Sequence, residues 1–365
     1  MWLSDSFLGR GFQESAFSLY KEKMKRQKGD SMRKVRLSDI AEAVGVSTVT
    51  VHNALTGQKG VSSNLRERIQ KVADEMGYEA LVREKKTEEG TAGFQRIGVL
   101  IAEKYLGNHT AYYWKIYQEL ALAATEKQCF TIVETLKTDE RVRIWEMPQM
   151  VLQNQVEGII IIGEIDKQYI RKLKESVSIP IVFLDFYDSE FAQDAVIVDN
   201  FYGMYQMTEV LFKHGFEEIG FIGSIHATNN IMDRYCGYMK SMMEHRKNIH
   251  PEWVIEDRDE TGFVEFELPK RLPKAFVCNC DLVAGMLVNK LNARGLKVPD
   301  DISVVGFDNF LYPGYADIKI TTYEVNIRAM VKVAIKKLMK QFRNPHSWGG
   351  PEIISGQVVM KNSVR

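Results

Sequence analysis

The sequence contains little cysteine and no long apolar segment, and both absences narrow the classes of protein to consider. Four cysteines among 365 residues, Cys129, Cys236, Cys278 and Cys280, are too few for a disulfide framework, and neither a Cys-x-x-Cys pair nor a histidine cluster accompanies them. We therefore expect reduced thiols and no metal site. No segment offers the roughly 18 uninterrupted apolar residues that a membrane span needs. The first residues lack the basic start and apolar core of a signal peptide.

Motifs typical of enzymes are absent as well. The sequence has no nucleophile elbow, no P-loop, no glycine-rich dinucleotide fingerprint and no metal-ligand spacing. Scattered carboxylates do not by themselves make a general acid–base pair. We therefore expect a protein that is not an enzyme and that needs no cofactor.

Charge is balanced overall but unevenly placed. Lysine and arginine together number 48, as do aspartate and glutamate, so the formal net charge is zero. Residues 1–36 hold nine Lys/Arg and four Asp/Glu, which gives +5 here and leaves −5 on the remainder. A basic start on an acidic body is typical of contact with a polyanion, although a solvated basic tail explains the same charge equally well.

The sequence divides into four segments. Residues 1–34 show no sustained periodicity and are predicted to be a basic, poorly ordered extension. Residues 35–78 carry three short helical patterns, and residues 79–96 are charged and poor in apolar side chains, as in a linker. Residues 97–365 alternate short apolar runs with longer helical stretches.

The second segment has the pattern of two helices joined by a glycine turn, with a third helix closing the core. Ser38 is placed to cap a helix over residues 39–44, and Gly45 can adopt the positive φ of a tight turn. Ser47 is placed to cap a second helix over residues 48–56. This spacing predicts a helix-turn-helix whose second helix enters the major groove of DNA.

The outward face of that second helix carries residue types that read base edges. Asn53 suits a bidentate contact to adenine, His52 can donate to a guanine acceptor, and Val49 can touch a thymine methyl group; Thr48 lies on the same face. On spacing alone, a small helical bundle that binds nothing stays an open alternative.

The same segment resembles the opening of the lac repressor (LacI/GalR) family of bacterial regulators. Residues 37–51 read Leu-Ser-Asp-Ile-Ala-Glu-Ala-Val-Gly-Val-Ser-Thr-Val-Thr-Val, and the likeness continues through Val61-Ser62, Arg66 and Met76-Gly77-Tyr78. The match is long and keeps the family's spacing. It implies a sequence-specific DNA-binding transcriptional regulator.

The resemblance also implies roles for individual residues. The implied DNA-binding set is Ser47, Thr48, Val49, Thr50, His52, Asn53, Ser62 and Arg66. Within it, Ser47 and Thr50 contact phosphates, while Thr48 and Val49 read bases. His52 and Asn53 stand where the family usually has Ser and Arg, so the operator sequence of better-known members cannot be carried over.

The last segment predicts parallel sheets covered by helices on both faces. The expected strands are 97–102, 158–162, 181–184, 195–198, 219–222, 275–278 and 302–306, and the expected helices are 112–127, 203–214, 282–294 and 329–342. Ligands of such sheets bind beyond the carboxyl ends of the strands. The acids found there are Glu103, Glu164, Asp185, Asp281 and Asp308. Five acids in comparable places favour a polar ligand cleft, although each one alone is consistent with helix capping.

Further segments resemble the effector domain of the same family, among them Val198-Asp199-Asn200, Ile219-Gly220-Phe221-Ile222-Gly223 and the run from Val298 to Asp308. The resemblance implies an α/β fold, with an N-terminal three-helix helix-turn-helix head joined to a two-lobed Rossmann-like (periplasmic-binding-protein-like) effector domain. Arg234, Asp281 and Asp308 match family effector contacts. A neutral sugar would suit such carboxylates together with an aromatic floor.

Two further residues complete the predicted effector site. Asp185 is included because it follows a predicted strand. Tyr113 is included as one of the aromatic residues that could form the floor of the site, which are Tyr112, Tyr113, Trp114, Phe186 and Tyr187. Each aromatic residue alone is equally consistent with a place in the core.

Two departures from the family pattern bear on function. Cys280 stands where the family commonly has Asn beside the Asp, so one effector hydrogen bond is expected to be missing. Thr87 stands where the family linker has a Leu that wedges into the minor groove. A Thr would unstack bases poorly, so the usual hinge-helix switch is not expected.

We therefore predict a cytoplasmic transcriptional regulator, a repressor rather than an activator. It is expected to bind a palindromic double-stranded operator as a homodimer, under control of a small polar effector such as a sugar or sugar derivative, with no membrane partner. One alternative is a ligand-binding module of the same fold with weak or lost DNA binding, which the altered linker favours. A DNA binder without ligand control is another, supported only by Cys280.

Overall fold

The computed structural model describes residues 35, 37–55, 61–76, 95–106, 111–137, 146–191, 194–259, 262–312, 318–344, 347 and 349–365. The chain divides into two compact units, residues 1–91 and 92–365. The predicted extension over residues 1–34 and the predicted linker up to residue 94 lie outside the described residues.

The described part of the first unit consists of three helices, α2 (Leu37–Val44), α3 (Thr48–Leu55) and α4 (Ser63–Glu75). Ile40, Val51 and Ile69 are fully buried at the centre of its apolar core. Gly45 has φ of +75°, the left-handed conformation that glycine adopts without strain, so the predicted tight turn is confirmed. The prediction that Ser38 caps the first helix is wrong, because α2 already begins at Leu37.

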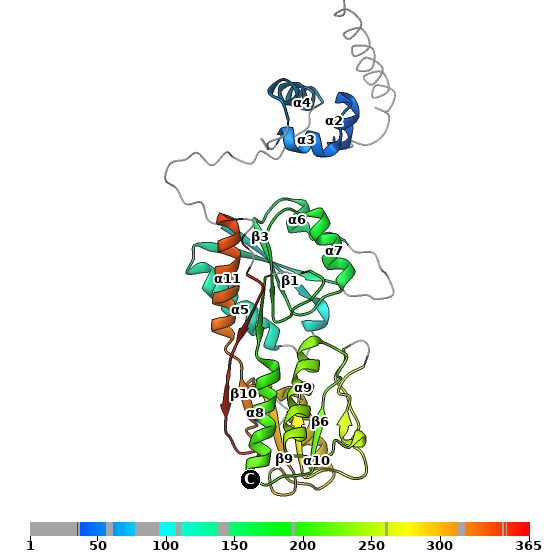
Figure 1. Cartoon of the computed structure of the whole chain (residues 1–365), viewed down its shortest axis with the longest axis vertical. Helices are drawn as coiled ribbons and strands as arrows, with labels where there is room; N and C mark the ends of the chain where they lie inside the picture. Colours follow the sequence, from blue (N-terminus) through cyan, green and yellow to red (C-terminus); the bar gives the residue numbers. More distant parts are fainter. Residues whose placement is uncertain are drawn as a thin grey trace, which may run out of the picture. The chain divides into compact units, whose positions relative to one another are not determined.

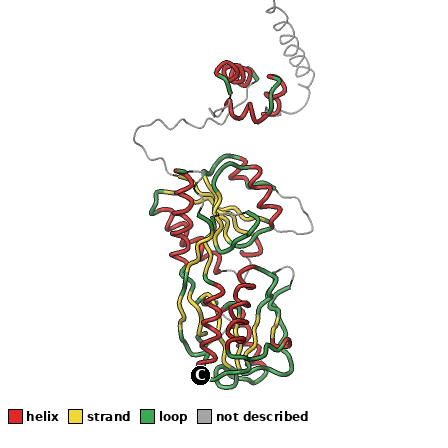
Figure 2. The backbone as a smooth tube through the Cα atoms, in the orientation of Figure 1, coloured by secondary structure: helices red, strands yellow, loops and turns green. Residues whose placement is uncertain are grey.

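The second unit contains two sheets with helices packed on them (Figures 1 and 2). Within the described residues the first sheet has six strands in the order β11-β5-β4-β3-β1-β2, and all neighbours are parallel. The strands are β1 (Gln95–Ala102), β2 (Cys129–Leu136), β3 (Gly158–Ile162), β4 (Ile181–Leu184), β5 (Ala195–Val198) and β11 (Pro351–Ile354). This sheet and its helices are called lobe 1.

The second sheet has the order β12-β10-β9-β8-β6-β7 in the described chain. Its strands are β6 (Ile219–Ile222), β7 (Val254–Ile255), β8 (Ala275–Cys278), β9 (Ser303–Asp308), β10 (Thr321–Glu324) and β12 (Gln357–Val359). Neighbours are parallel except β10 and β12, which are antiparallel. This sheet and its helices are called lobe 2.

Helices cover both sheets. Lobe 1 has η1 (Glu103–Tyr105), α5 (Ala111–Thr125), α6 (Gln149–Leu152), α7 (Lys167–Ser176) and α11 (Ile327–Arg343). Lobe 2 has α8 (Asn200–Lys213), α9 (Asn229–Glu244), η2 (Pro251–Trp253) and α10 (Asp281–Ala293). A Cβ atom at Gly237 would lie 2.1 Å from the carbonyl oxygen of Phe201, so this glycine lets α9 pack closely against α8.

The two lobes are connected by chain segments that run between the sheets. In the described residues the chain passes from one lobe to the other between β5 and α8, between β10 and α11, and between β11 and β12. The predicted two-lobed α/β architecture is confirmed, and the carboxyl ends of β4 and β9 carry two of the predicted site residues, Asp185 and Asp308.

Most predicted strands are confirmed to the residue. The strands expected at 158–162, 181–184, 195–198, 219–222 and 275–278 have these bounds in the structure. The first and last expected strands are longer than predicted, because β1 begins at Gln95 and β9 continues to Asp308. The elements that the sequence did not predict are β2, β7, β10, β11, β12, α6, α7 and α9.

Candidate effector site and DNA-binding face

The exposed face of α3 presents the residues predicted to read DNA. The hydroxyl of Ser47 accepts a hydrogen bond from the backbone N–H of Thr50 at 3.1 Å, as an N-cap does, and lies 2.9 Å from the Thr50 hydroxyl. The Val49 side chain is 65% exposed, and Thr48 and His52 are exposed beside it. An apolar side chain this exposed makes little contribution to the core of the head, so it is available to a partner.

Three further predicted DNA contacts differ in surroundings, and Ser62 is the exposed one. Asn53 and Arg66 are partly buried, and Ser62 caps α4 by accepting from the backbone N–H of Leu65 at 3.4 Å. Nη1 of Arg66 donates to the carbonyl oxygens of Asn53 and Ala54 at 3.2 and 2.8 Å. A cation at the carboxyl end of α3 also suits the helix dipole. Arg66 therefore fixes α3 against α4 and Ser62 caps α4, while contact of either residue with DNA stays a prediction.

Arg234, on α9, is the centre of a buried polar cluster. Its Nε donates to Oδ1 of Asn200 at 2.8 Å, and its Nη1 donates to the carbonyl oxygen of Asn279 at 2.7 Å. Its Nη2 lies 3.4 Å from Oδ1 of Asp308, and the guanidinium carbon lies 3.9 Å from the ring centroid of Phe307. All three guanidinium nitrogens therefore have partners within the protein.

Asp185 and Asp308 approach this cluster from different lobes. Asp185 follows β4 with φ of +67°, and Asp308 ends β9 with φ of +101°, both unusual for residues other than glycine. The Oδ1 atom of each is buried and has no hydrogen-bond partner within the described residues. Buried polar atoms are nearly always satisfied in folded proteins, so these two require a further donor.

Two tyrosines at the start of α5 complete the lobe 1 side. The hydroxyl of Tyr112 is also buried without a hydrogen-bond partner in the described chain, and its ring meets Phe310 of lobe 2 edge-on at 6.3 Å. Tyr113 stacks on Tyr105 with ring centroids 4.4 Å apart. Burial raises the pKa of Tyr113, and the charge of Asp185 adds to that rise. The structure thus brings together the predicted residues Tyr113, Asp185, Arg234 and Asp308.

Asp281 differs from the other predicted effector residues because protein groups bond both of its carboxylate oxygens. Oδ1 accepts from the hydroxyl of Thr322 at 2.8 Å, and Oδ2 accepts from the backbone N–H of Phe310 at 3.0 Å. A Cβ atom at Gly306 would lie 2.0 Å from Oδ1 of Asp281, so glycine is needed there to make room for the carboxylate. Asp281 therefore ties α10 to β10 and to the loop that follows β9.

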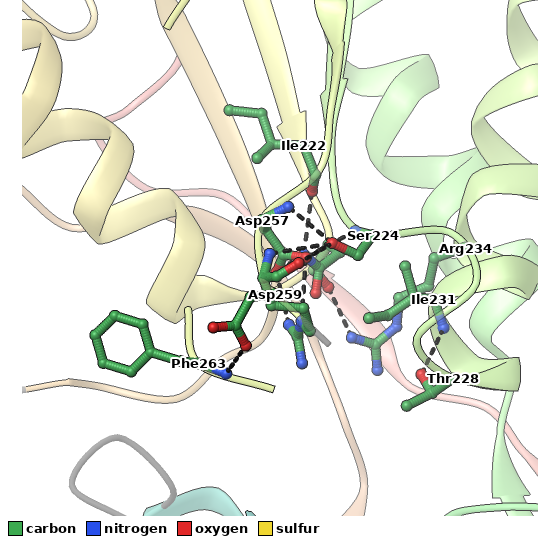
Figure 3. A network of polar contacts seen from close by, with 10 residues as sticks. Ile222, Ser224, Thr228, Ile231, Arg234, Asp257, Asp259 and Phe263 are labelled. Carbon is green, nitrogen blue, oxygen red and sulfur yellow. Dashed lines mark hydrogen bonds and ion pairs between the residues drawn. The ribbon is translucent and has the colours of Figure 1, made fainter. Parts of the chain in front are cut away.

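A second polar network, which the sequence did not predict, adjoins Arg234 (Figure 3). Asp257 is fully buried and accepts from the backbone N–H of Ser224 at 2.7 Å and from Nδ2 of Asn279 at 2.8 Å. It also accepts from Nε and Nη2 of Arg258 at 3.1 and 2.6 Å. Because the carbonyl of Asn279 accepts from Arg234, Asn279 connects the two arginine residues.

Burial sets the ionisation of these groups. It raises the pKa of Asp185 to about 6 and that of Asp308 to about 7, and the nearby charge of Arg234 opposes both rises. It also raises the pKa of the Cys280 thiol to about 12, so this thiol stays protonated. Burial disfavours the Asp257 carboxylate, but the hydrogen bonds and charge of Arg258 outweigh burial and lower the pKa of Asp257.

The two remaining acids at strand ends lie elsewhere. Glu103 is exposed in η1. Oε2 of Glu164 accepts from the backbone N–H of Asn229 at 3.0 Å, which joins lobe 1 to the start of α9 in lobe 2. Asn230 adds a second bond between the lobes, because its Nδ2 donates to the carbonyl oxygen of Asp185 at 2.9 Å.

An open groove of about 720 Å³ lies beside Asp308. Its walls include the segment from Glu324 to Arg328 and the segment from Ser355 to Gln357. Both segments belong to connections between the lobes, so the shape of this groove depends on the angle between the lobes.

The cysteines and the helices give no sign of a metal or membrane role. All four cysteines are free. Within the described residues, no cluster of histidine, cysteine and carboxylate side chains could hold a metal ion. None of the described helices is both long enough and apolar enough to span a membrane.

Comparison with known families agrees with this arrangement. Residues 36–80 match the family of bacterial regulatory proteins called lacI, and residues 208–364 match a periplasmic binding protein-like domain. The Ribose operon repressor of Haemophilus influenzae is 22% identical to this chain over 335 residues, which is 90% of this chain and 98% of that protein.

Solved structures share the fold. The lac repressor dimer bound to operator and the anti-inducer ONPF matches with a TM-score of 0.60 at 19% identity, over 91% of this chain and 99% of that one. The complex of the transcriptional regulator CelR with cellobiose matches with a TM-score of 0.61 at 17% identity, over 90% and 100% of the two chains.

The two family matches follow each other in the order that the fold requires, head first and effector domain second. The relatives span nearly the whole of the described chain, and they are regulators rather than enzymes. The chain is therefore a DNA-binding transcriptional regulator, with a head that matches the lacI family of bacterial regulatory proteins and an effector domain that matches periplasmic binding proteins.

Proposed function

We propose that the chain represses transcription as a homodimer by binding a palindromic operator through α3 of each head. A small polar effector bound between the two lobes controls this binding. The solved relative that is a dimer on operator DNA and the repressor named for a ribose operon support this assignment. The same relatives support action in the cytoplasm, where the DNA is.

The observation that carries the effector assignment is a set of buried oxygen atoms from both lobes that have no hydrogen-bond partner in the described chain. They are Oδ1 of Asp185, the hydroxyl of Tyr112 and Oδ1 of Asp308, of which the last has only its ion pair with Arg234 at 3.4 Å. Sugar hydroxyls donate to carboxylates and both donate to and accept from a tyrosine hydroxyl. A sugar or sugar derivative fits these atoms, and the CelR relative was solved with cellobiose.

The roles of the predicted site residues follow from their surroundings. In the head, Ser47 and Thr50 contact phosphates, while Thr48, Val49, His52 and Asn53 face base edges. Arg66 positions α3, and Ser62 caps α4. In the effector site, Tyr113, Asp185 and Asp308 contact the ligand, and Arg234 and Asp281 hold the walls of the site in place.

A palindromic operator follows from the proposed two-fold symmetry. Two heads related by a dimer axis bind half-sites about one helical turn apart, roughly 34 Å. Because the unpartnered oxygens are buried, a ligand reaches them only when the lobes separate. Its binding therefore selects among lobe arrangements, and only a difference in affinity between these arrangements can change operator binding.

Footprinting on DNA flanking the protein's own gene, at several salt concentrations, tests this proposal. We expect a protected palindrome that persists at moderate salt and whose occupancy changes when the effector is added. Diffuse protection that vanishes at moderate salt would indicate phosphate electrostatics alone. That result would favour a ligand-binding module with weak or lost DNA binding, which the Thr87 departure in the linker also favours.

A further inference from the structure

We propose that Arg258 is an anion-binding residue of the effector site, and that the effector is a sugar bearing one carboxylate or phosphate group. This inference rests on the proposed effector function and deepens it. Arg258 was not among the residues that the sequence predicted, and it follows β7 directly after Glu256 and Asp257.

The first step is that every nitrogen of the Arg234 guanidinium already has a partner within the protein. Its Nε, Nη1 and Nη2 contact Asn200, Asn279 and Asp308 respectively. One face of its guanidinium lies against Phe307. Arg234 therefore organises the cluster, and a cation with an unpartnered nitrogen is better placed to bind an anionic group of a ligand.

Arg258 presents the opposite situation. Asp257 takes the side edge of its guanidinium, formed by Nε and Nη2. Nη1 has no hydrogen-bond partner within the described residues, so the end edge formed by Nη1 and Nη2 stays available. The two N–H groups of such an edge are parallel and match a carboxylate or phosphate in a bidentate contact.

The location of Arg258 places this edge between the lobes. Its side chain is 19% exposed, while that of Asp257, which anchors it, is fully buried. Burial is the main cause of the raised pKa of Asp308 in lobe 2 and of Tyr105 in lobe 1. The positive charge of Arg258 lowers the pKa of both groups. Asn279 bonds both Asp257, which holds Arg258, and Arg234, so the Arg258 guanidinium lies beside the cluster where the ligand is proposed to bind.

An anionic group would bind here through free N–H donors rather than through an excess of positive charge. Arg234 pairs with Asp308, and Arg258 pairs with Asp257, so each guanidinium is already neutralised once. A guanidinium with a free edge can bridge a second anion, because its donors are spread over two edges. The unpartnered oxygens of Asp185 and Tyr112 then serve the hydroxyl groups of the same ligand. One end of the ligand is therefore acidic, and the rest carries hydroxyls.

Calorimetric titration of the full chain with matched pairs of sugars tests this inference. The probes are D-glucose with D-glucuronate and with glucose 6-phosphate, and D-galactose with D-galacturonate. We expect at least one acidic member to bind 10-fold or more tightly than its neutral partner, as a charge-assisted bidentate contact predicts. Preference for a uronate or for a sugar phosphate identifies which anion the site takes.

Variants at Arg258 separate charge from geometry. Arg258→Met should weaken the acidic sugar by about 10-fold to 100-fold and leave the neutral partner within about 2-fold. Arg258→Lys keeps the charge without the fork and should recover only part of the loss. Arg171→Met, at an exposed ion pair with Glu190, is the matched control and should change neither affinity.

Loss of Arg258 leaves Asp257 buried without its ion pair, so folding needs its own control. The double variant Asp257→Asn/Arg258→Met removes both charges and keeps an acceptor oxygen for the backbone N–H of Ser224, while Nδ2 of Asn279 retains its bond to the carbonyl oxygen of Ile222. It should fold and show the same loss of preference for the acidic sugar.

Two results would overturn the inference. One is that no acidic probe binds the wild-type chain better than its neutral partner, and the other is that Arg258→Met weakens both members of a pair equally. A different result would contradict the proposed function. If an acidic sugar binds through Arg258 but never changes operator occupancy, the anion site stands and effector control does not.

Discussion

The carboxyl groups of Asp185 and Asp308 make ligand affinity depend on pH, and the direction of this dependence follows from their pKa values. Burial raises the pKa of Asp185 to about 6 and that of Asp308 to about 7. A hydroxyl that donates to a carboxylate favours the ionised form, so ligand binding lowers both pKa values and releases protons. Sugar affinity should therefore fall as pH is lowered, by at least about 10-fold between pH 8 and pH 5.5. Calorimetry of the best probe across this range measures it.

The variant Asp308→Asn removes the carboxyl group that has the higher of the two pKa values. Asparagine keeps an oxygen that can accept from a ligand but does not titrate. We expect weaker binding at pH 8 and a nearly flat response down to about pH 6.5, below which Asp185 still titrates. An affinity that rises as pH is lowered would contradict the assignment of hydroxyl donors to these carboxylates.

At the residue scale, acidic residues that follow apolar strands could be predicted as site residues. Site residues could not be predicted where the sequence shows no strand pattern. Asp185 and Asp308 follow continuous apolar runs, so their place at the strand ends could be inferred. Arg258 follows β7, which has only two residues, Val254 and Ile255, and is set among charged neighbours. No periodicity marks so short a strand. Its position beside Arg234 depends on Asn279, which is distant in sequence.

Variants in α3 can distinguish side chains that read the DNA sequence from side chains that stabilise the helix. His52→Ala and Asn53→Ala should change the order of preference among operator variants, because these side chains are proposed to face base edges. Ser47→Ala removes the N-cap bond to Thr50 and should lower affinity uniformly, by about 5-fold for a loss of roughly 1 kcal/mol. Selection from a binding-site library measures both effects.

The matched control for these head variants is Ser63→Ala. Ser63 is exposed at the start of α4, and Ser62 is the residue that caps this helix. The control should leave both affinity and preference unchanged. An equal loss across all operator variants for His52→Ala and Asn53→Ala would remove their base-reading roles.

At the element scale, uninterrupted apolar runs decided which strands could be predicted, and β10, which is largely buried but reads Thr-Thr-Tyr-Glu, was missed because it has no such run. Every residue of β3, β4, β5, β6 and β8 is buried, and such strands appear in the sequence as uninterrupted apolar runs. The strands β2, β7, β11 and β12 lie at the edges of their sheets and are only partly covered. Their mixed composition follows from partial exposure, so no continuous run marks them.

The effector unit as a whole depends on bonds between its lobes. Asn230 donates to the carbonyl oxygen of Asp185 across the lobes, and its own Oδ1 accepts from Nδ2 of Asn200. The bond to Asp185 joins lobe 2 to lobe 1 and so favours the arrangement in which the lobes are closed on each other, whereas the bond to Asn200 lies within lobe 2. Asn230→Ala should lower the closed population, and apparent ligand affinity falls in proportion to the fraction of molecules that can bind. We expect affinity to fall by about 10-fold for loss of one or two buried hydrogen bonds.

Comparing the loss of affinity for acidic and neutral sugars distinguishes an effect on lobe closure from the loss of a ligand contact. Asn230→Ala should weaken acidic and neutral sugars by the same factor, because both need the closed lobes, whereas Arg258→Met should act on the acidic sugar alone. Asn292→Ala, at an exposed position near the end of α10, should change neither. Calorimetry with one matched sugar pair measures all three variants. If Asn230→Ala weakened only one member of the pair, Asn230 would be a ligand contact, and the bond between Asn230 and Asp185 would not control lobe closure.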